Sequence, residues 1–321
     1  MATYNNMVGR TEAAALIRPE EANEIIANVA EKSTFLKMAR KLPNMASSVR
    51  EYPVQLTEPI AGFVDGDAGL KITTNMSWEK TSLKAAEVAA IIPVPDNVAA
   101  DSDFDIFGIL RPQLEAAAAK VIDAAVFFGT GKPSEWPDGI VPAATAAGNI
   151  VYAGTSEKMY DNIFGVDGLI AKVEEDGYFV DGIVASVKTR AKLRGLKDTT
   201  ERPLFVQNMQ SATPYLLNGV RMEFPRNGSF NADTTQMIAG DFQQAVYAFR
   251  QDVTFDIFDS GVISDDDGKV ILNLMQNDMK AIRMVMRLGW QIFNPVNGLN
   301  LVTAQRYPFA VYSTAASAGG D

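Results

Sequence analysis

The clearest periodicity in the chain lies between Phe107 and Phe128, where apolar side chains recur at steps of three and four residues, on one face of a helix. The middle of this segment is rich in Ala, which loses no side-chain entropy in a helix. Pro112 fits without a kink only if residues 103–108 form a separate lead-in and Pro112 lies in the first turn, where its missing N–H is not needed. Glycines and prolines at 129–139 predict that the helix ends in a fixed corner.

Two long segments near the C-terminus alternate apolar and polar side chains, which is typical of strands with one covered face. The polar positions include aspartates in residues 247–257 and arginines in residues 282–290. If these strands pair antiparallel across the turn region at 264–268, the arginines of one can face the aspartates of the other.

Two more strands are predicted at 49–56 and 73–83, on either side of residues 57–72, which are too long for a tight hairpin turn. An isolated two-stranded ribbon is only marginally stable in water. We therefore expect the ribbon to rest on a neighbouring molecule, with Met76 and Trp78 as anchors. A β-meander packed on the protein's own core is an equally open alternative at this point.

Shorter patterns predict the remaining elements. A helix is expected from Pro19, with Ile25, Ile26 and Val29 on its apolar face, and a short segment at 35–42 follows it. Further helices are predicted at 159–173, ending at Gly177, and at 188–194. Buried strands are predicted at 88–94 and 181–186, and other strands at 204–206, 219–224 and 237–242. Residues 96–105 are predicted as a lead-in to the long helix and 141–154 as a linker, and a mixed α/β layer fits residues 150–245.

The composition narrows the possible functions. The 321 residues, 47% of them hydrophobic, can bury a sizeable core. The chain has no Cys and no His, which excludes disulfides, thiolate chemistry and every Ser-His arrangement. The net charge of −10 argues against a protein that binds nucleic acid by neutralising phosphates. Without a membrane span or a secretory segment at the N-terminus, we expect synthesis in the cytoplasm.

No motif predicts a catalytic, cofactor-binding or metal site. Gly129 to Lys132 lacks the first glycine and the final Ser or Thr of a phosphate-binding loop, and it follows a helix instead of preceding one. The aspartates at 265–267, and Asp65 with Asp67, lack calcium-loop spacing and are expected to be solvated turn residues. The basic residues Lys188, Arg190, Lys192, Arg194 and Lys197 predict a surface face, with a local anionic contact as the minority alternative.

The order of the pieces is more informative than any motif. A short arm, a long ribbon, a strand into Asp101-Ser102, a long helix, and the corner that ends Pro-Asp-Gly-Ile140 follow one another. Then come an α/β layer with Tyr215-Leu-Leu-Asn-Gly219, and Gly240-Asp-Phe242 leading into two long strands. From about residue 19 to 311, this order resembles the major capsid proteins of tailed bacteriophages, with the Hong Kong 97-type fold.

The resemblance implies an α+β fold with defined parts. These are an N-terminal arm with short helices (1–46, the arm proper being 1–18), an extended E-loop (47–86), a peripheral domain with a long spine helix (87–149), an axial domain (150–245), the long strands of the peripheral domain (246–288), and a return to the axial domain with the C-terminal tail (289–321). Candidate contacts between subunits are Met76, Trp78, Lys71, Lys80, Arg50 and Tyr52.

Two features of the family are not expected here. Some members begin with a long removable scaffolding segment, and this arm is too short for one, so scaffolding would be a separate protein or unnecessary. Some members join subunits by a Lys–Asn isopeptide bond. Lys71 and Lys80 lie on the ribbon, but nothing identifies a partner.

The expected function is self-assembly, as hexamers and pentamers, into an icosahedral shell around double-stranded DNA, with a portal protein and possible scaffolding and decoration proteins as partners. The protein would be part of the virion and assembled in the host bacterial cytoplasm. Two alternatives remain: an encapsulin-like compartment around a cargo enzyme, and a soluble α/β enzyme using carboxylates and lysines.

Overall fold

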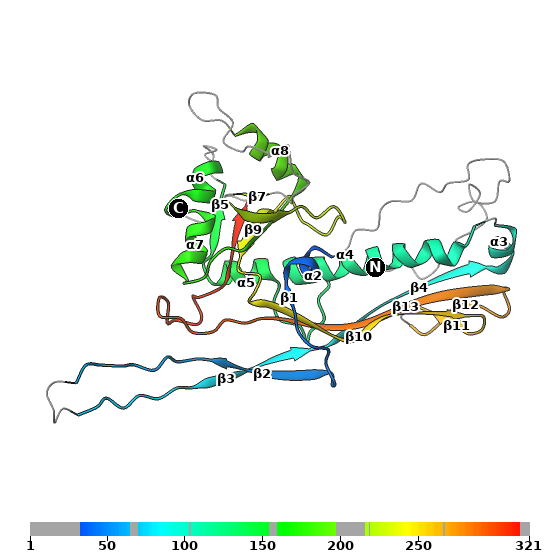
Figure 1. The fold of residues 1–321 in the computed structure, drawn as a ribbon. Helices are drawn as coiled ribbons and strands as arrows, with labels where there is room; N and C mark the ends of the chain where they lie inside the picture. Colours follow the sequence, from blue (N-terminus) through cyan, green and yellow to red (C-terminus); the bar gives the residue numbers. More distant parts are fainter. Residues whose placement is uncertain are drawn as a thin grey trace.

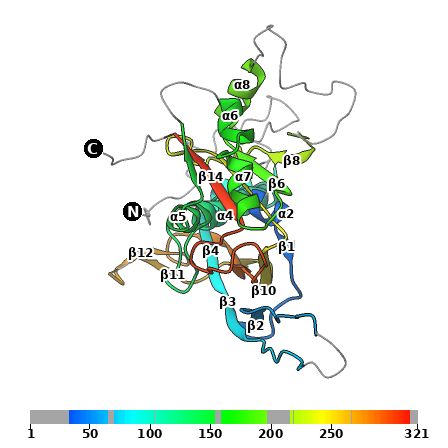
Figure 2. The ribbon, with the colours of Figure 1, turned by 90° about the vertical axis from the view of Figure 1, so that its left-hand side faces the viewer.

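Helix α4 (Ile106–Phe128) lies along one face of a four-stranded sheet and sets the long dimension of the molecule (Figure 1). A second lobe, built on a six-stranded sheet, lies at the C-terminal end of α4, and a thin ribbon leaves the body beneath it (Figures 1 and 2). The computed structural model describes residues 33–64, 70–102, 104–153, 159–196, 216–217, 219–265 and 267–314.

The start of α4 differs from the prediction. Asp105 caps the helix, because its side chain accepts a hydrogen bond from the Gly108 N–H at 3.0 Å. The helix therefore begins at Ile106, Pro112 falls in its second turn, and the predicted separate lead-in at 103–108 is wrong. Pro112 is exposed on the surface of the helix, so its ring displaces no packed neighbour.

The predicted end of α4 and the corner after it are confirmed. Gly129 ends the helix in the left-handed conformation, at φ 70°. Gly139 then returns so close that a Cβ on it would lie 2.4 Å from the Gly129 nitrogen. Only glycine fits this contact, which fixes the direction of the chain into helix α5 (Ile140–Ala146).

The long sheet has the strand order β1 (Arg40–Lys41), β10 (Ala245–Phe258), β13 (Met279–Ile292), β4 (Ala86–Pro95). The predicted antiparallel pairing of the two long strands is confirmed, and Arg283 contacts Asp256 across it at 3.0 Å. Their connection also contains a small hairpin, formed by β11 (Val262–Ser264) and β12 (Val270–Asn273). Apolar side chains from β10, β13 and α4 form the main core between helix and sheet.

Strand β4 is less buried than its sequence suggested. It lies at the edge of the sheet, its exposure alternates along much of its length, and Ile91 is 50% exposed. The predicted buried strand at 88–94 is buried only at Pro93 and Val94, because an apolar run does not reveal that one face is open. The edge position explains how Pro93 and Pro95 can lie within the strand.

The second lobe has the strand order β5 (Ile150–Tyr152), β14 (Phe309–Ser313), β9 (Thr235–Gly240), β6 (Gly182–Ala185), β8 (Val220–Glu223), β7 (Leu216–Leu217). The predicted strands at 181–186, 219–224 and 237–242 correspond to β6, β8 and β9. The predicted basic helix is α8 (Val187–Gly195). Helices α5, α7 (Leu169–Glu175) and α8 contact this sheet.

Two other predictions in this lobe were wrong. The expected linker at 141–154 contains α5 and β5, because small residues, mostly Ala, favour a helix and β5 pairs with the distant strand β14. The expected single helix at 159–173 is broken at Gly165–Gly168 into α6 (Met159–Phe164) and α7, which leaves Val166 87% exposed.

At the N-terminal side, α2 (Thr34–Met38) and β1 replace the predicted short segment at 35–42, and α3 (Asp96–Asp101) precedes α4. The helix predicted from Pro19 and the strand predicted at 204–206 lie outside the described residues.

Candidate assembly surface

The ribbon is an antiparallel pair, β2 (Val49–Gln55) and β3 (Trp78–Lys84), that continues as two arms beyond the strands. Hydrogen bonds link the arms farther out, from Leu56 N to Ser77 O at 2.9 Å and from Ile60 N to the Thr74 hydroxyl at 2.9 Å. Figures 1 and 2 both show the ribbon extending away from the body. The protein's own core therefore does not cover it, and the meander alternative is wrong.

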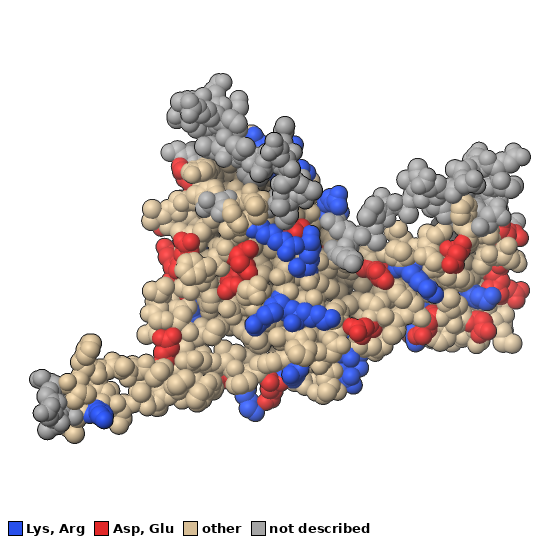
Figure 3. All heavy atoms as spheres, viewed as in Figure 1, with Lys and Arg blue, Asp and Glu red and all other residues tan. Residues whose placement is uncertain are grey.

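Large apolar side chains are exposed along the outer part of the ribbon. Phe63 is 108% exposed, Leu70 94% and Ile60 71%. Figure 3 shows few charged side chains on the visible face of the ribbon, whereas both signs of charge are interspersed over the body. These three residues are not among the contact residues predicted from the sequence. The available signal was the presence of large apolar residues in a Gly- and Asp-containing stretch, where solvated loops normally have none.

The root of the ribbon, in contrast, is fixed to the body. Leu83 is fully buried, and the ring of Tyr52 packs on that of Phe293 with centroids 5.5 Å apart. Arg50 lies over the Tyr52 ring, and Val296 N donates to Gln55 O at 3.1 Å. Arg50 and Tyr52 thus make contacts within their own chain.

The other four candidate contact residues lie farther out. Met76 is 38% and Trp78 61% exposed, and Lys71 is exposed as well. Lys80 forms an ion pair with Glu51 at 2.8 Å, and the hydrogen bond to Glu51 raises the pKa of Lys80. The Lys80 side chain is 78% exposed, so this ion pair lies at the surface of the ribbon.

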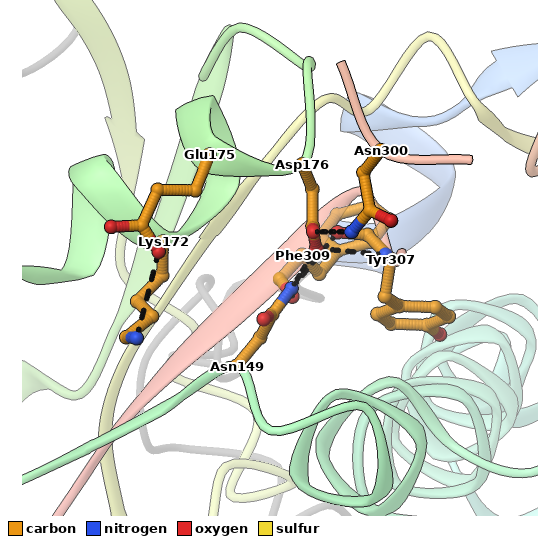
Figure 4. A network of polar contacts seen from close by, with 7 residues as sticks. All are labelled: Asn149, Lys172, Glu175, Asp176, Asn300, Tyr307 and Phe309. Atoms are coloured by element: carbon orange, nitrogen blue, oxygen red, sulfur yellow. Dashed lines mark hydrogen bonds and ion pairs between the residues drawn. The ribbon is translucent and has the colours of Figure 1, made fainter. Parts of the chain in front are cut away.

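A loop beside the ribbon root, residues 293–308, is held by buried polar groups. Asp176 accepts hydrogen bonds from Asn149 at 2.6 Å, from Asn300 at 2.8 Å and from the Tyr307 N–H at 3.0 Å (Figure 4). The guanidinium of Arg306, which is 1% exposed, donates to Asn294 and to the Asn300 carbonyl.

These contacts leave apolar side chains of the same loop facing solvent. Leu299 is 77% exposed, Leu301 67% and Val302 51%. Because buried hydrogen bonds fix the backbone, these side chains are displayed in a set geometry. The loop and the ribbon form one candidate assembly surface.

Residues of the phosphate-loop, calcium-loop and basic-cluster motifs make contacts within their own chain. Lys132 pairs with Asp138 at 3.1 Å within the corner. Asp265 accepts from Lys269 N in the β11–β12 turn, and Lys188 of α8 lies 3.7 Å from Asp233. Asp65, Asp67, Asp266 and Lys197 lie outside the described residues.

Two kinds of feature are absent from the described part of the chain. No group of three or more acidic residues is arranged to hold a metal ion there. None of the described helices is long and apolar enough to cross a membrane.

Comparisons with known proteins agree with this architecture. Residues 13–303 match the phage capsid family. A solved structure from Microbacterium phage Oxtober96 is 32% identical, with a TM-score of 0.81 over 97% of this chain and 100% of the other. One from Mycobacterium phage Bobi is 28% identical, with a TM-score of 0.79 over 97% and 100% of the two chains.

A curated relative, the major capsid protein of Staphylococcus phage 80alpha, is 22% identical over 292 residues, which cover 89% of this chain and 85% of the relative. The prediction of a tailed-phage capsid protein with the Hong Kong 97-type fold is confirmed: the chain belongs to the phage capsid family.

Proposed function

We propose that the chain is the repeated subunit of an icosahedral head shell, assembled as hexamers and pentamers in the bacterial cytoplasm and enclosing double-stranded DNA without sequence specificity. The observation that carries the proposal is the ribbon, on which the large apolar side chains of Phe63, Leu70 and Ile60 are exposed to solvent. Burying a large apolar side chain contributes roughly 1.5–3 kcal/mol, so a neighbour that covers this ribbon gains stability at every copy.

In this proposal each part has a role. The ribbon, residues 47–86, is an E-loop that lies over the adjacent subunit, with Met76, Trp78, Lys71 and Lys80 as contact residues. Arg50 and Tyr52 fix its root. Residues 87–149 and 246–288 form a peripheral domain around α4 as the spine helix. Residues 150–245 and 289–321 form an axial domain with the tail, and residues 1–18 are an arm that reaches neighbours.

The shell would also bind a portal protein, and scaffolding and decoration proteins where they exist. No catalytic activity is proposed. The acidic balance of the chain suits a container that must release its genome, because an acidic protein does not neutralise phosphates.

The test uses the ribbon. The purified protein should form shells visible by negative-stain electron microscopy, and Phe63→Ser with Leu70→Ser should remain as unassembled, folded subunits. Val166→Ser is the matched control, since Val166 is 87% exposed but lies on the other lobe, and it should assemble normally. Normal shells from the double variant would contradict the proposal.

Two further measurements distinguish the proposal from the encapsulin-like compartment and from the soluble enzyme. Shells isolated from a phage lysate should protect double-stranded DNA from nuclease. A protein cargo without DNA would instead identify an encapsulin-like compartment. A soluble enzyme would give a single small species by light scattering.

A further inference from the structure

A solvent-open groove of about 630 Å³ lies between α4, α2 and the long sheet. Its lining is mainly apolar, with Leu36 from α2, Ala116 and Ile122 from α4, Phe249 and Val253 from β10, and Met286 from β13. Val253, which lines the groove, is 37% exposed, whereas valine side chains next to a core are usually covered by other side chains. In the described part of the chain, nothing fills this groove.

The chain enters the described structure at this groove. Ser33, its first described residue, lines the groove and caps α2. The buried carboxylate of Asp123 on α4 accepts hydrogen bonds from the Ser33 hydroxyl, from Thr34 N at 2.9 Å and from Phe35 N at 3.1 Å. Asn227 donates to the same carboxylate at 2.8 Å. Ser33 is therefore held firmly, and the 32 residues before it start from the groove.

The sequence immediately upstream has the pattern that such a groove accepts. In the helix predicted from Pro19, Ala22, Ile25, Ile26 and Val29 share one face, and acidic residues occupy the opposite face. At 1.5 Å per residue, residues 19–29 would be about 16 Å long and the groove-lining part of α4 (115–122) about 12 Å. Only residues 30–32 separate the predicted helix from Ser33.

We propose that residues 19–29 dock as an amphipathic helix into this groove of their own subunit, with Ile25, Ile26 and Val29 toward α4 and β10. The short tether favours the same chain, because it gives a local concentration in the millimolar range. Docking completes the cover of the sheet and leaves only residues 1–18 to reach neighbours, which goes beyond the assembly role proposed above.

The absence of Cys from the chain allows a clean cross-linking test. In shells of full-length protein, Ile25→Cys with Ala116→Cys should form an intramolecular disulfide on mild oxidation, detected as a linked peptide by mass spectrometry. Glu24→Cys with Ala116→Cys is the matched control, since position 24 has nearly the same tether length but lies on the opposite predicted face. Equal cross-linking of both pairs, or of neither, would overturn the proposal.

Mixed shells separate docking in the same chain from docking in a neighbour. Chains carrying only Ile25→Cys are coassembled with chains carrying only Ala116→Cys. Disulfide dimers in these shells at the level of the double variant would place the helix on a neighbouring subunit and refute docking in the same chain. Their absence, with the intramolecular link present, supports it.

A second measurement does not depend on disulfides. Ala116→Trp fills the groove and should accelerate trypsin cleavage after Lys32 by about tenfold, because the displaced segment becomes accessible. Ala117→Trp is the control, since Ala117 is exposed on the same helix outside the groove. Unchanged cleavage in Ala116→Trp would argue against docking, whether or not shells form.

Discussion

Two antiparallel strand pairs of similar design have opposite surroundings in this molecule. Strand β1 pairs with the outer side of β10 and β4 with the outer side of β13, and the apolar face of the β10–β13 pair packs against α4. The pair β2–β3 has no third strand among the described residues, and its outer part exposes Trp78, Phe63 and Leu70. Both strand pairs are joined by antiparallel backbone hydrogen bonds, so they differ in whether other parts of the subunit cover their side chains.

This difference shows where the free energy of each region comes from. A two-stranded sheet with nothing covering its side chains gains little apolar burial and is marginal alone, whereas a covered sheet is stable within one subunit. The long sheet therefore stabilises the monomer, and the ribbon reaches its full stability only in an assembly. The predictions below follow from this contrast and are ordered by their expected effect on the free energy of unfolding of the unassembled subunit.

The largest effect is expected for Trp290→Ala in β13. Trp290 is 1% exposed and makes edge contacts with Phe35 and Trp136, at 5.7 and 6.3 Å between ring centroids. Removing such a side chain leaves a cavity and costs about 3–5 kcal/mol. Urea unfolding followed by circular dichroism measures the loss, and a cost near zero would mean that the long sheet does not stabilise the monomer.

Asp123→Ala should rank second. The substitution leaves the Thr34 and Phe35 N–H groups and the Asn227 amide without their acceptor. Buried donors without a partner cost about 1–3 kcal/mol each, partly relieved by water, so we expect a loss of about 2–4 kcal/mol. Hydrogen exchange should rise in α2, the element that this carboxylate fixes, while β2 and β3 keep their wild-type rates. Faster exchange in the ribbon alone would refute this account.

A smaller effect is expected from pH. Burial, the largest cause, raises the pKa of Asp123, although hydrogen bonds from Ser33, Thr34, Phe35 and Asn227 act to lower it. The folded chain then binds this proton more tightly than the unfolded chain. The stabilising contribution is complete below the ordinary carboxyl pKa of about 4 and is lost as pH rises through the raised pKa.

The matching measurement compares wild type with Asp123→Asn by urea unfolding at several pH values above 4, below the concentration at which shells form. The stability of wild type relative to the variant should decrease as pH rises. A constant difference would show that the hydrogen bonds balance burial, and an increasing one that they outweigh it; either would contradict the raised pKa of Asp123.

The smallest effect on the subunit is expected for Trp78→Ala, the ribbon counterpart of Trp290→Ala. Trp78 is 61% exposed, so its loss should change the free energy of unfolding of the unassembled subunit by less than about 0.5 kcal/mol. Assembled shells of the variant should nevertheless dissociate at lower urea concentration than wild type. Equal losses in the two tryptophan variants would remove the contrast between the regions.

The sequence predicted the elements whose signals are local. The alternation in β10 and β13, the Ala-rich centre of α4 and the glycines after it give the right elements, and the contact between Arg283 and Asp256 followed from the alternation. The errors arose where a distant partner decides. Strand β5 forms because β14 lies beside it, and β4 is half exposed because the sheet ends there.

For the assembly surface, the sequence predicted a ribbon that leaves the body but not which side chains it exposes most. Met76 and Trp78 alternate within the strand predicted at 73–83, although β3 begins only at Trp78, whereas Phe63 and Leu70 lie where no regular pattern exists. The role of Asp123 was not visible either, because its partners Ser33 and Asn227 are 90 and 104 residues away.

The free edge of β4 has a consequence for how a second copy of the chain can approach the long sheet. The register with β13 runs without interruption from Ala86 to Pro95, so the donors missing at Pro93 and Pro95 lie on the open side. Another strand approaching that side finds a gap in the row of N–H groups that it would need. The missing donors at Pro93 and Pro95 therefore disfavour the addition of a further strand at this edge.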